Sequence, residues 1–197
     1  MQRVKTALPA ATGLAGAALV LAGCAAPAEP SAAPQPGADG LTRIVRLARE
    51  RAVLSDQVAA SKFGSGKPVT DSAREAVVVD TARADATRDG VDPEWAARVF
   101  RDQIAASTHV QNELLRQWRE HPDQRPSRQP DLAQVRPQLD RIGDELIAAL
   151  KTATPARENP ACGATLEQVV GREAADLDPI HRAALDRALN SVCPLPS

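Results

Sequence analysis

The sequence contains very few aromatic residues and none of the common metal or phosphate motifs. Only 2% of the 197 residues are aromatic and Tyr is absent, which disfavours a β-sandwich. With a formal net charge of −1 and few rings to stack on bases, nucleic-acid binding is not indicated. No CxxC or close Cys/His pairing is present, nor a Gly-rich phosphate loop. We therefore expect no nucleic acid, no metal and no cofactor.

The residues that are abundant favour a helical protein. Hydrophobic residues make up 43% of the chain, with Ala and Leu dominant, which is typical of helices packed through small aliphatic side chains. The length suffices for one domain with a substantial core. We predict an all-α fold, a single bundle of five to six helices over residues 41–197, with no strand.

The N-terminal residues have the pattern of an export signal. Arg3 and Lys5 precede an apolar stretch that is short and Gly-rich for a membrane span. The stretch ends in LAGC at Cys24, which resembles the lipobox of bacterial lipoproteins; an ordinary cleaved signal that happens to contain Cys is the alternative. We expect a signal peptide over 1–23, lipidation of Cys24 and a disordered Pro/Ala-rich tether over 24–40. The protein would then be exported to the cell envelope, on the periplasmic side, and would touch the membrane only through this lipid anchor.

Two further cysteines lie in the exported part, where disulfides form. Cys162 and Cys193 flank two short helical patterns, over 164–175 and from Asp178 onward. A helical hairpin brings its two ends together, so a disulfide could close there; two free buried thiols are the alternative. Such a bridge would contribute roughly 3–4 kcal/mol by loop entropy.

Helix signals divide the rest of the chain. The spacing of Ser72 and Glu75 is that of a capping box and predicts a helix from about residue 71 to 88. Asp92 and Pro93 have the N-cap and N1 pattern that opens a long helix. Apolar positions also recur at helical spacing over 40–62 and 132–150.

Two cations lie on the apolar stripe of the first predicted helix. Ile44, Ser55 and Val58 occupy its inward positions, and Arg51 and Lys62 fall on the same stripe. They are eleven residues apart, or about three turns and roughly 16 Å along the helix. Buried cations are costly unless anions compensate them, so this stripe predicts a pocket for a small polyanion.

Other polar residues join this set from neighbouring helices. Ser107 and Gln111 interrupt the apolar stripe of the long third helix one turn apart. The candidate pocket residues are Arg51, Lys62, Asp71, Arg74, Glu75, Ser107, Gln111 and Arg136. Pro137 biases Arg136 away from a regular helical turn, so we expect Arg136 at a helix start or kink. Because the set has no nucleophile paired with a base, it predicts binding and charge stabilisation without covalent chemistry.

The three histidines do not join this set. His109 is two residues from both Ser107 and Gln111, and therefore points away from their face. His121 and His181 are interpreted as terminal or surface residues, and all three as solvated.

The ordered series of motifs resembles the secreted, gamma-class AroQ chorismate mutases. The resemblance runs through the helix with Arg51 and Lys62, TDSARE at 70–75, DPEWAARVFRDQI at 92–104, PDL at 130–132 followed by Arg136, and the cysteine pair. It implies an isomerase that converts chorismate to prephenate without a cofactor. It also implies a homodimer with a complete pocket in each protomer.

The resemblance assigns roles to the candidate residues. It implies that Arg51, Arg74 and Arg136 hold the two carboxylates with help from Ser107. Lys62 and Gln111 would donate to the ether oxygen, and Glu75 with the segment around Asp71 would hold the ring hydroxyl. We expect Arg51, Lys62 and Gln111 to be catalytic.

Two features depart from the family pattern or leave alternatives open. Some relatives have Glu where this chain has Gln111, and Pro137 leaves the geometry of Arg136 open. Taken singly, Arg74 and Glu75 could belong to a solvated helix start, and Arg51 could extend to the surface. A non-catalytic exported lipoprotein that binds a small anion or a protein partner is the alternative function, and a structural envelope protein is a third.

Overall fold

A computed structural model describes residues 35–194, and the regular structure within this range is helical, with no strand. The predicted signal peptide, Cys24 and most of the predicted tether lie outside the described residues. The elements are α1 (Ala38–Lys62), α2 (Ser72–Asp89), α3 (Pro93–Glu120), the 3₁₀ turn η1 (Pro122–Gln124), α4 (Leu132–Arg157), α5 (Cys162–Glu173) and α6 (Pro179–Ala188). The predicted all-α fold is confirmed.

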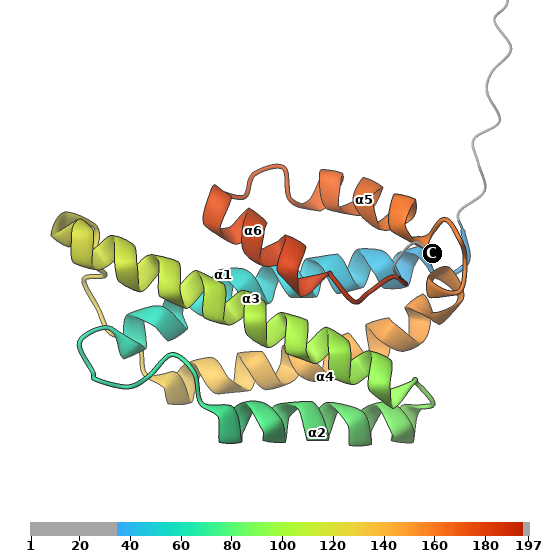
Figure 1. Ribbon diagram of the computed structural model, residues 1–197, viewed down its shortest axis with the longest axis horizontal. Coiled ribbons are helices and arrows are strands. Elements are labelled where there is room, and N and C mark those ends of the chain that lie inside the picture. Colours follow the sequence, from blue (N-terminus) through green and yellow to red (C-terminus); the bar gives the residue numbers. More distant parts are fainter. Residues whose placement is uncertain (1–34, 195–197) are drawn as a thin grey trace, which may run out of the picture. The chain divides into compact units, whose positions relative to one another are not determined.

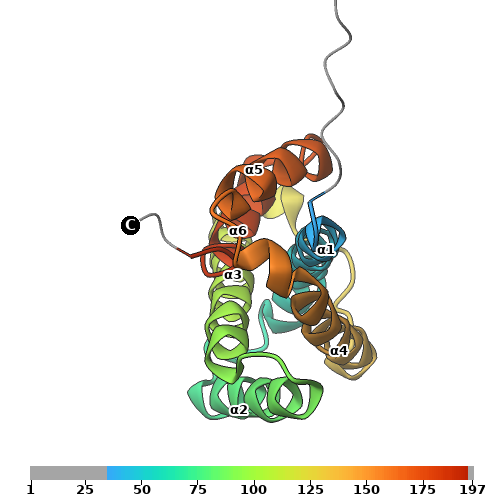
Figure 2. The same ribbon diagram turned by 90° about the vertical axis from the view of Figure 1, so that its right-hand side faces the viewer.

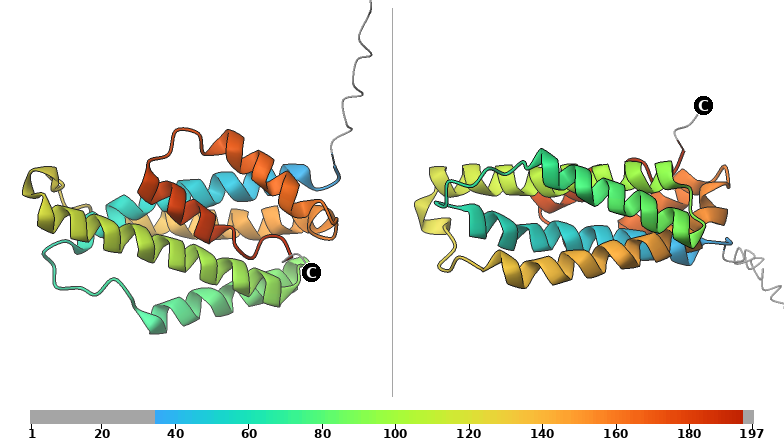
Figure 3. Two further views of the ribbon diagram at one scale, coloured as in Figure 1. Left: turned by 45° about the horizontal axis from the view of Figure 1, so that its top comes forward. Right: turned by 90° about the horizontal axis from the view of Figure 1, so that it is seen from below.

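The helices of the described domain form three levels (Figure 1). Helices α1, α3 and α4 make up the middle, α2 lies against α3 and α4 on one side, and α5 and α6 lie on the other. The end-on view in Figure 2 shows α2 and α5 at opposite extremes. Figure 3 shows α1, α2, α3 and α4 running along the length of the domain. Helices α1, α2, α3 and α4 thus pack against one another along the length of the domain.

Helix α1 is the centre of the core. Its predicted inward positions Ile44, Ser55 and Val58 are buried. The helix starts at Ala38, so the last three residues of the expected tether belong to it. Gly40 permits a close approach to α4, because a Cβ there would lie 2.4 Å from a backbone nitrogen of that helix.

The start of α2 differs in detail from the capping-box prediction. The N-cap is Asp71, whose Oδ1 accepts a hydrogen bond from the Arg74 backbone N–H at 3.1 Å. Glu75 Oε1 accepts from the Asp71 backbone N–H at 3.4 Å. Ser72 is the first helical residue and does not cap, because the aspartate one position earlier fills that role.

Helix α2 is held by few buried side chains. Of its 18 residues only Val79, Ala82 and Ala86 are buried, and Val77 is 64% exposed. Gly90 ends the helix in the left-handed conformation that glycine adopts readily. The helix thus lies on the bundle through a narrow stripe of small residues.

The prediction for Arg136 is wrong. Helix α4 starts at Leu132 with Asp131 as its N-cap and continues through Arg136 and Pro137. Pro137 lacks only the hydrogen bond to the carbonyl of Ala133, four residues earlier, and Ala133 is exposed. Solvent can satisfy that carbonyl, so the helix tolerates the proline and Arg136 lies within a helical turn.

The C-terminal hairpin confirms the predicted disulfide and corrects the histidine assignment. Cys162 and Cys193 are bonded, with their Cα atoms 5.7 Å apart. His181 is not solvated but 93% buried, with an exposed fraction of 7%. Its Nδ1 lies 2.5 Å from Asp178 Oδ2 and its Nε2 lies 2.9 Å from Asp56 Oδ1. Helix α6 is therefore tied to α1 by a histidine between two carboxylates.

Candidate active site

A polar pocket of about 130 Å³ lies among α1, α2 and α3. Seven of the eight residues predicted from the sequence line it. They are Arg51, Lys62, Asp71, Arg74, Glu75, Ser107 and Gln111, and the lining is completed by Val69, Val78, Ile104 and Thr108. Arg136 does not line it and is exposed on α4. The three helices thus bring together residues that are up to 60 positions apart in the sequence.

Arg51 is the most deeply placed cation of the pocket. Its Nε is buried and has no hydrogen-bond partner among residues 35–194. Burial lowers the pKa of Arg51 to about 10, and the carboxylate of Asp140 opposes the shift. The guanidinium is still charged at neutral pH, so a buried charge and an unmatched donor both face the interior. An anion in the pocket would satisfy both.

Lys62 closes the end of the pocket at the C-terminus of α1. Its Nζ donates to the carbonyl of Val69 at 2.7 Å, which leaves two of its three N–H groups available. Burial lowers the pKa of Lys62, the carboxylates of Asp71 and Glu75 oppose that shift, and the charge of Arg74 adds to it. The ammonium is therefore held by both the loop after α1 and the start of α2.

Several arginines outside the pocket are paired with carboxylates, whereas two cations of the pocket are not. Arg46, Arg83 and Arg116 each pair with a carboxylate at 2.9 Å or less. Within the described part of the chain, Arg51 and Lys62 form no ion pair within 4 Å. The pocket therefore has a local positive field in a protein of nearly balanced charge.

Ser107 and Gln111 form one wall on α3. Gln111 Nε2 donates to both the backbone carbonyl and the hydroxyl of Ser107, each at 3.1 Å. Gln111 Oε1 is buried without a partner among the described residues. Ser55 on α1 lies behind this pair, and its Oγ is 2.8 Å from Ser107 Oγ. The sequence pattern placed Ser55 on the inward stripe but did not indicate this contact.

A larger cavity of about 710 Å³ between α2 and α4 shares Arg51, Asp71, Arg74 and Val78 with the polar pocket. Its remaining walls are both apolar and acidic. They include Val77, Ala82, Phe100, Leu139, Asp85, Asp140 and Asp144. Arg136 is four residues before Asp140 and therefore lies on the same face of α4, one turn nearer its start. The two spaces together are large enough for a small organic ligand.

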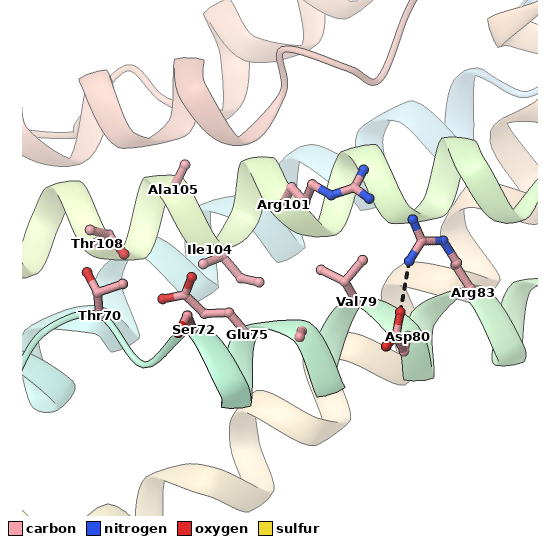
Figure 4. A pocket seen from close by; sticks show the side chains of 11 residues that line it. Thr70, Ser72, Glu75, Val79, Asp80, Arg83, Arg101, Ile104, Ala105 and Thr108 are labelled. Atoms are coloured by element: carbon pink, nitrogen blue, oxygen red, sulfur yellow. Dashed lines mark hydrogen bonds and ion pairs between the residues drawn. The ribbon is translucent and has the colours of Figure 1, made fainter.

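A separate groove opens on the other side of α2 (Figure 4). It lies between α2 and α3 and shares Glu75, Ile104 and Thr108 with the polar pocket. An ion pair between Asp80 and Arg83 lies at the far end, with a distance of 2.9 Å. The carboxylate of Glu75 thus stands between the groove and the cationic pocket.

The described residues supply no group of three or more His, Cys, Asp or Glu side chains that could hold a metal ion. In the same range, no helix has both the length and the apolar character needed to cross a membrane. What the pocket offers is a set of cations, two hydroxyls, an amide and two carboxylates. Such groups can bind an anionic ligand, fix its conformation and stabilise developing negative charge.

Comparison with known proteins identifies the family. Residues 42–112 match the family model described as chorismate mutase type II. The secreted chorismate mutase of Mycolicibacterium smegmatis is 34% identical over 158 residues, which cover 79% of this chain and 87% of that protein. The chain belongs to the chorismate mutase family.

Solved structures agree with this membership. The chorismate mutase of Burkholderia thailandensis is 40% identical, has a TM-score of 0.74, and is matched over 78% of this chain and 99% of its own. The secreted chorismate mutase of Yersinia pestis is 20% identical with a TM-score of 0.61, matched over 76% of this chain and 94% of its own. The latter similarity shows that the chorismate mutase fold is shared.

Proposed function

We propose that this protein is a chorismate mutase, an isomerase that rearranges chorismate to prephenate. The observation that carries the proposal is the group of unpaired cations in a pocket of a chorismate mutase fold. The rearrangement is intramolecular and its substrate is a dicarboxylate. It needs no nucleophile and no cofactor, and it is accelerated by groups that hold the folded conformer and stabilise charge on the breaking ether bond.

The arginines are proposed to hold the carboxylates. Arg51 and Arg74 face both the polar pocket and the larger cavity, and a guanidinium can bind a carboxylate through two parallel hydrogen bonds. Ser107 would assist with its hydroxyl, whose single proton can serve either a carboxylate or the Gln111 amide oxygen. Arg136 would reach the substrate from α4 across the larger cavity, which requires its exposed side chain to turn inward.

Lys62 and Gln111 are proposed to donate to the ether oxygen. Lys62 has two N–H groups beyond the one bound to Val69. Both N–H groups of Gln111 are directed to Ser107, so a half-turn of the amide would present one of them to the pocket. The oxygen of the amide could then accept from the Ser107 hydroxyl.

Glu75 is proposed to accept a hydrogen bond from the ring hydroxyl, together with the segment around Asp71. Its carboxylate lines the pocket at the start of α2. A carboxylate at this position also offsets the charge of Lys62, as the opposing effect on the Lys62 pKa indicates. The pocket would thus match a ligand that has two carboxylates at one end and a hydroxyl at the other.

We also propose that the enzyme is exported and anchored at Cys24 by lipid, as a homodimer of the gamma class. The basic and apolar start of the chain and the LAGC sequence support export and lipidation. The relative from Mycolicibacterium smegmatis carries the word secreted in its name. Incorporation of a radiolabelled fatty acid into the native chain but not into Cys24→Ala tests the anchor, and sedimentation tests the dimer.

Turnover of chorismate tests the proposed activity. The loss of chorismate absorbance and the formation of prephenate are followed for the native protein, for Arg51→Ala and for Lys62→Ala. We expect each substitution to lower kcat/KM by about 10²–10³-fold, the effect of removing a positioned donor from a charge-stabilising site. Arg46→Ala is the matched control, because Arg46 is an exposed arginine of the same helix paired with Glu173. A folded native protein without turnover would refute the proposal and favour a non-catalytic anion-binding lipoprotein.

A further inference from the structure

Ser55 is a completely buried residue of α1, with an exposed fraction of 0%, and it does not line the pocket. Its hydroxyl donates to the carbonyl of Arg51, one turn earlier in the same helix, at 2.9 Å. That bond alone satisfies a buried serine hydroxyl in a helix. The second hydrogen bond of Ser55, to Ser107, is therefore not needed to bury the side chain.

This second bond joins α1 to the wall of the pocket on α3. The two hydroxyl oxygens are 2.8 Å apart, and Ser107 Oγ also accepts from Gln111 Nε2 at 3.1 Å. The three side chains form one chain of hydrogen bonds, of which only Ser107 and Gln111 face the pocket. A ligand oxygen that bonds to Ser107 or Gln111 therefore competes with the hydrogen bonds among these three side chains.

The single proton of each hydroxyl gives the chain two states. When Ser55 donates to the Arg51 carbonyl, the proton between the two serines must come from Ser107. The Ser107 hydroxyl is then unable to donate elsewhere. When Ser55 turns its proton to Ser107 Oγ, the Ser107 proton is free to donate to a ligand oxygen or to the oxygen of the Gln111 amide. The rotation of Ser55 thus determines what Ser107 can do.

We propose that Ser55 is a positioning residue for the rearrangement, acting through Ser107 on the orientation of the Gln111 amide. This inference rests on the proposed chorismate mutase activity. With Ser55 as donor, Ser107 Oγ stays fixed while its proton turns toward Gln111 Oε1. That bond stabilises the amide in the orientation that presents an N–H to the ether oxygen. Ser55 does not contact the substrate and acts only through its hydrogen bond to Ser107.

Removing the hydroxyl gives a defined kinetic expectation. In Ser55→Ala the Ser107 hydroxyl turns among its staggered positions, and the Gln111 amide loses a fixed partner. We expect kcat to fall about 3- to 10-fold, the range that corresponds to one hydrogen bond. KM changes by less than about twofold, because the arginines still hold the carboxylates. The melting temperature shifts by less than about 4 °C, since alanine favours the helix.

A double-mutant cycle distinguishes positioning from a structural role. The values of kcat, KM and melting temperature are measured for the native protein, Ser55→Ala, Ser107→Ala and the double variant. If Ser55 acts through Ser107, its substitution has no further effect on kcat once Ser107 is alanine. Thr42→Val is the matched control, because it removes a half-buried hydroxyl of α1 that bonds only to a backbone carbonyl, that of Ala38 at 3.1 Å.

Each outcome decides the proposal. An unchanged kcat in Ser55→Ala overturns the role of Ser55. The same holds if Ser55→Ala lowers kcat by the same factor in the native protein and in Ser107→Ala. A loss of kcat that accompanies a fall of more than about 10 °C in melting temperature overturns it too, in favour of a structural role. Ser55→Cys, which replaces the hydroxyl with a somewhat larger thiol that is only a weak donor, replaces the alanine variant if that fails to fold. A native protein without turnover refutes the proposed activity, and this result is distinct from every outcome for Ser55.

Discussion

The buried histidine between two carboxylates predicts a pH-dependent stability outside the pocket. The hydrogen bond to Asp56 is the main cause that raises the pKa of His181, and Asp178 raises it further. Burial opposes both effects, and the resulting pKa is about 9. A group whose pKa is higher in the folded state stabilises the fold fully below its unfolded pKa of about 6.5 and loses that contribution as the pH rises through its folded pKa. The stabilisation therefore disappears between about pH 6.5 and 9.

The magnitude follows from the size of the shift. At 1.36 kcal/mol per pKa unit, the shift from 6.5 to about 9 corresponds to roughly 3 kcal/mol. The side chains of Asp56 and Asp178 are 45% and 55% exposed, and solvent screens such pairs. We therefore expect about 2 kcal/mol, which is a change of roughly 4–8 °C in melting temperature for a protein of this size.

The test compares the native protein with His181→Gln, which can donate and accept but carries no charge. Urea unfolding at pH 6.5 and at pH 9.5 gives the difference in free energy of unfolding between the two proteins. That difference should shrink by about 2 kcal/mol from the lower to the higher pH. Burial also lowers the pKa of Lys62, but Lys62 is present in both proteins and its effect cancels. A difference that stays constant, or grows with pH, would refute the reasoning.

Three other predictions concern the reaction and the packing. Native turnover should be independent of pH from about pH 5 to 8, whereas Gln111→Glu should have an acidic optimum, because a carboxyl donates only when protonated. A native rate that falls sharply between about pH 5 and 8 without unfolding would contradict the role of Gln111. Replacing Cys162 and Cys193 by alanine should lower the free energy of unfolding in urea by roughly 3–4 kcal/mol, since they are 31 residues apart; an unchanged value would count against this. Gly40→Ala should cost about 1–3 kcal/mol by the same measurement, because its Cβ would meet the backbone of α4 at 2.4 Å. Gly163→Ala, with nothing within 4 Å, is the control and should be neutral or slightly stabilising.

The sequence was sufficient where local chemistry determines the structure. Two helices start as predicted, each with an aspartate as its N-cap followed by a proline in the first turn. These are Asp92 with Pro93, and Asp178 with Pro179. Helical periodicity alone predicts that Arg51 and the pocket residues of α3 lie on inward faces. These signals are contained within one or two turns of chain.

The sequence was insufficient where partners are distant. His181 bonds to Asp56, 125 positions earlier, so no local pattern indicates the pair. One signal was present: His181 is spaced three and four residues from Ala184 and Leu185, which are buried. Arg136 was misplaced for a different reason, because the local preference against a helix before proline is weaker than the packing of α4.

The shallow attachment of α2 gives the two sides of the pocket unequal local stability. Amide hydrogen exchange in α1 and α3 requires opening of the core, whereas α2 contributes only three buried side chains of its own, Val79, Ala82 and Ala86, and can separate more easily. In the free protein, α2 amides should therefore exchange faster than those of α1 and α3. A ligand that bridges Arg51 to Arg74 joins the tightly packed side to the loosely packed one. Its binding should then slow exchange in α2 more than anywhere else in the bundle, so that substrate completes the ordering of its own site.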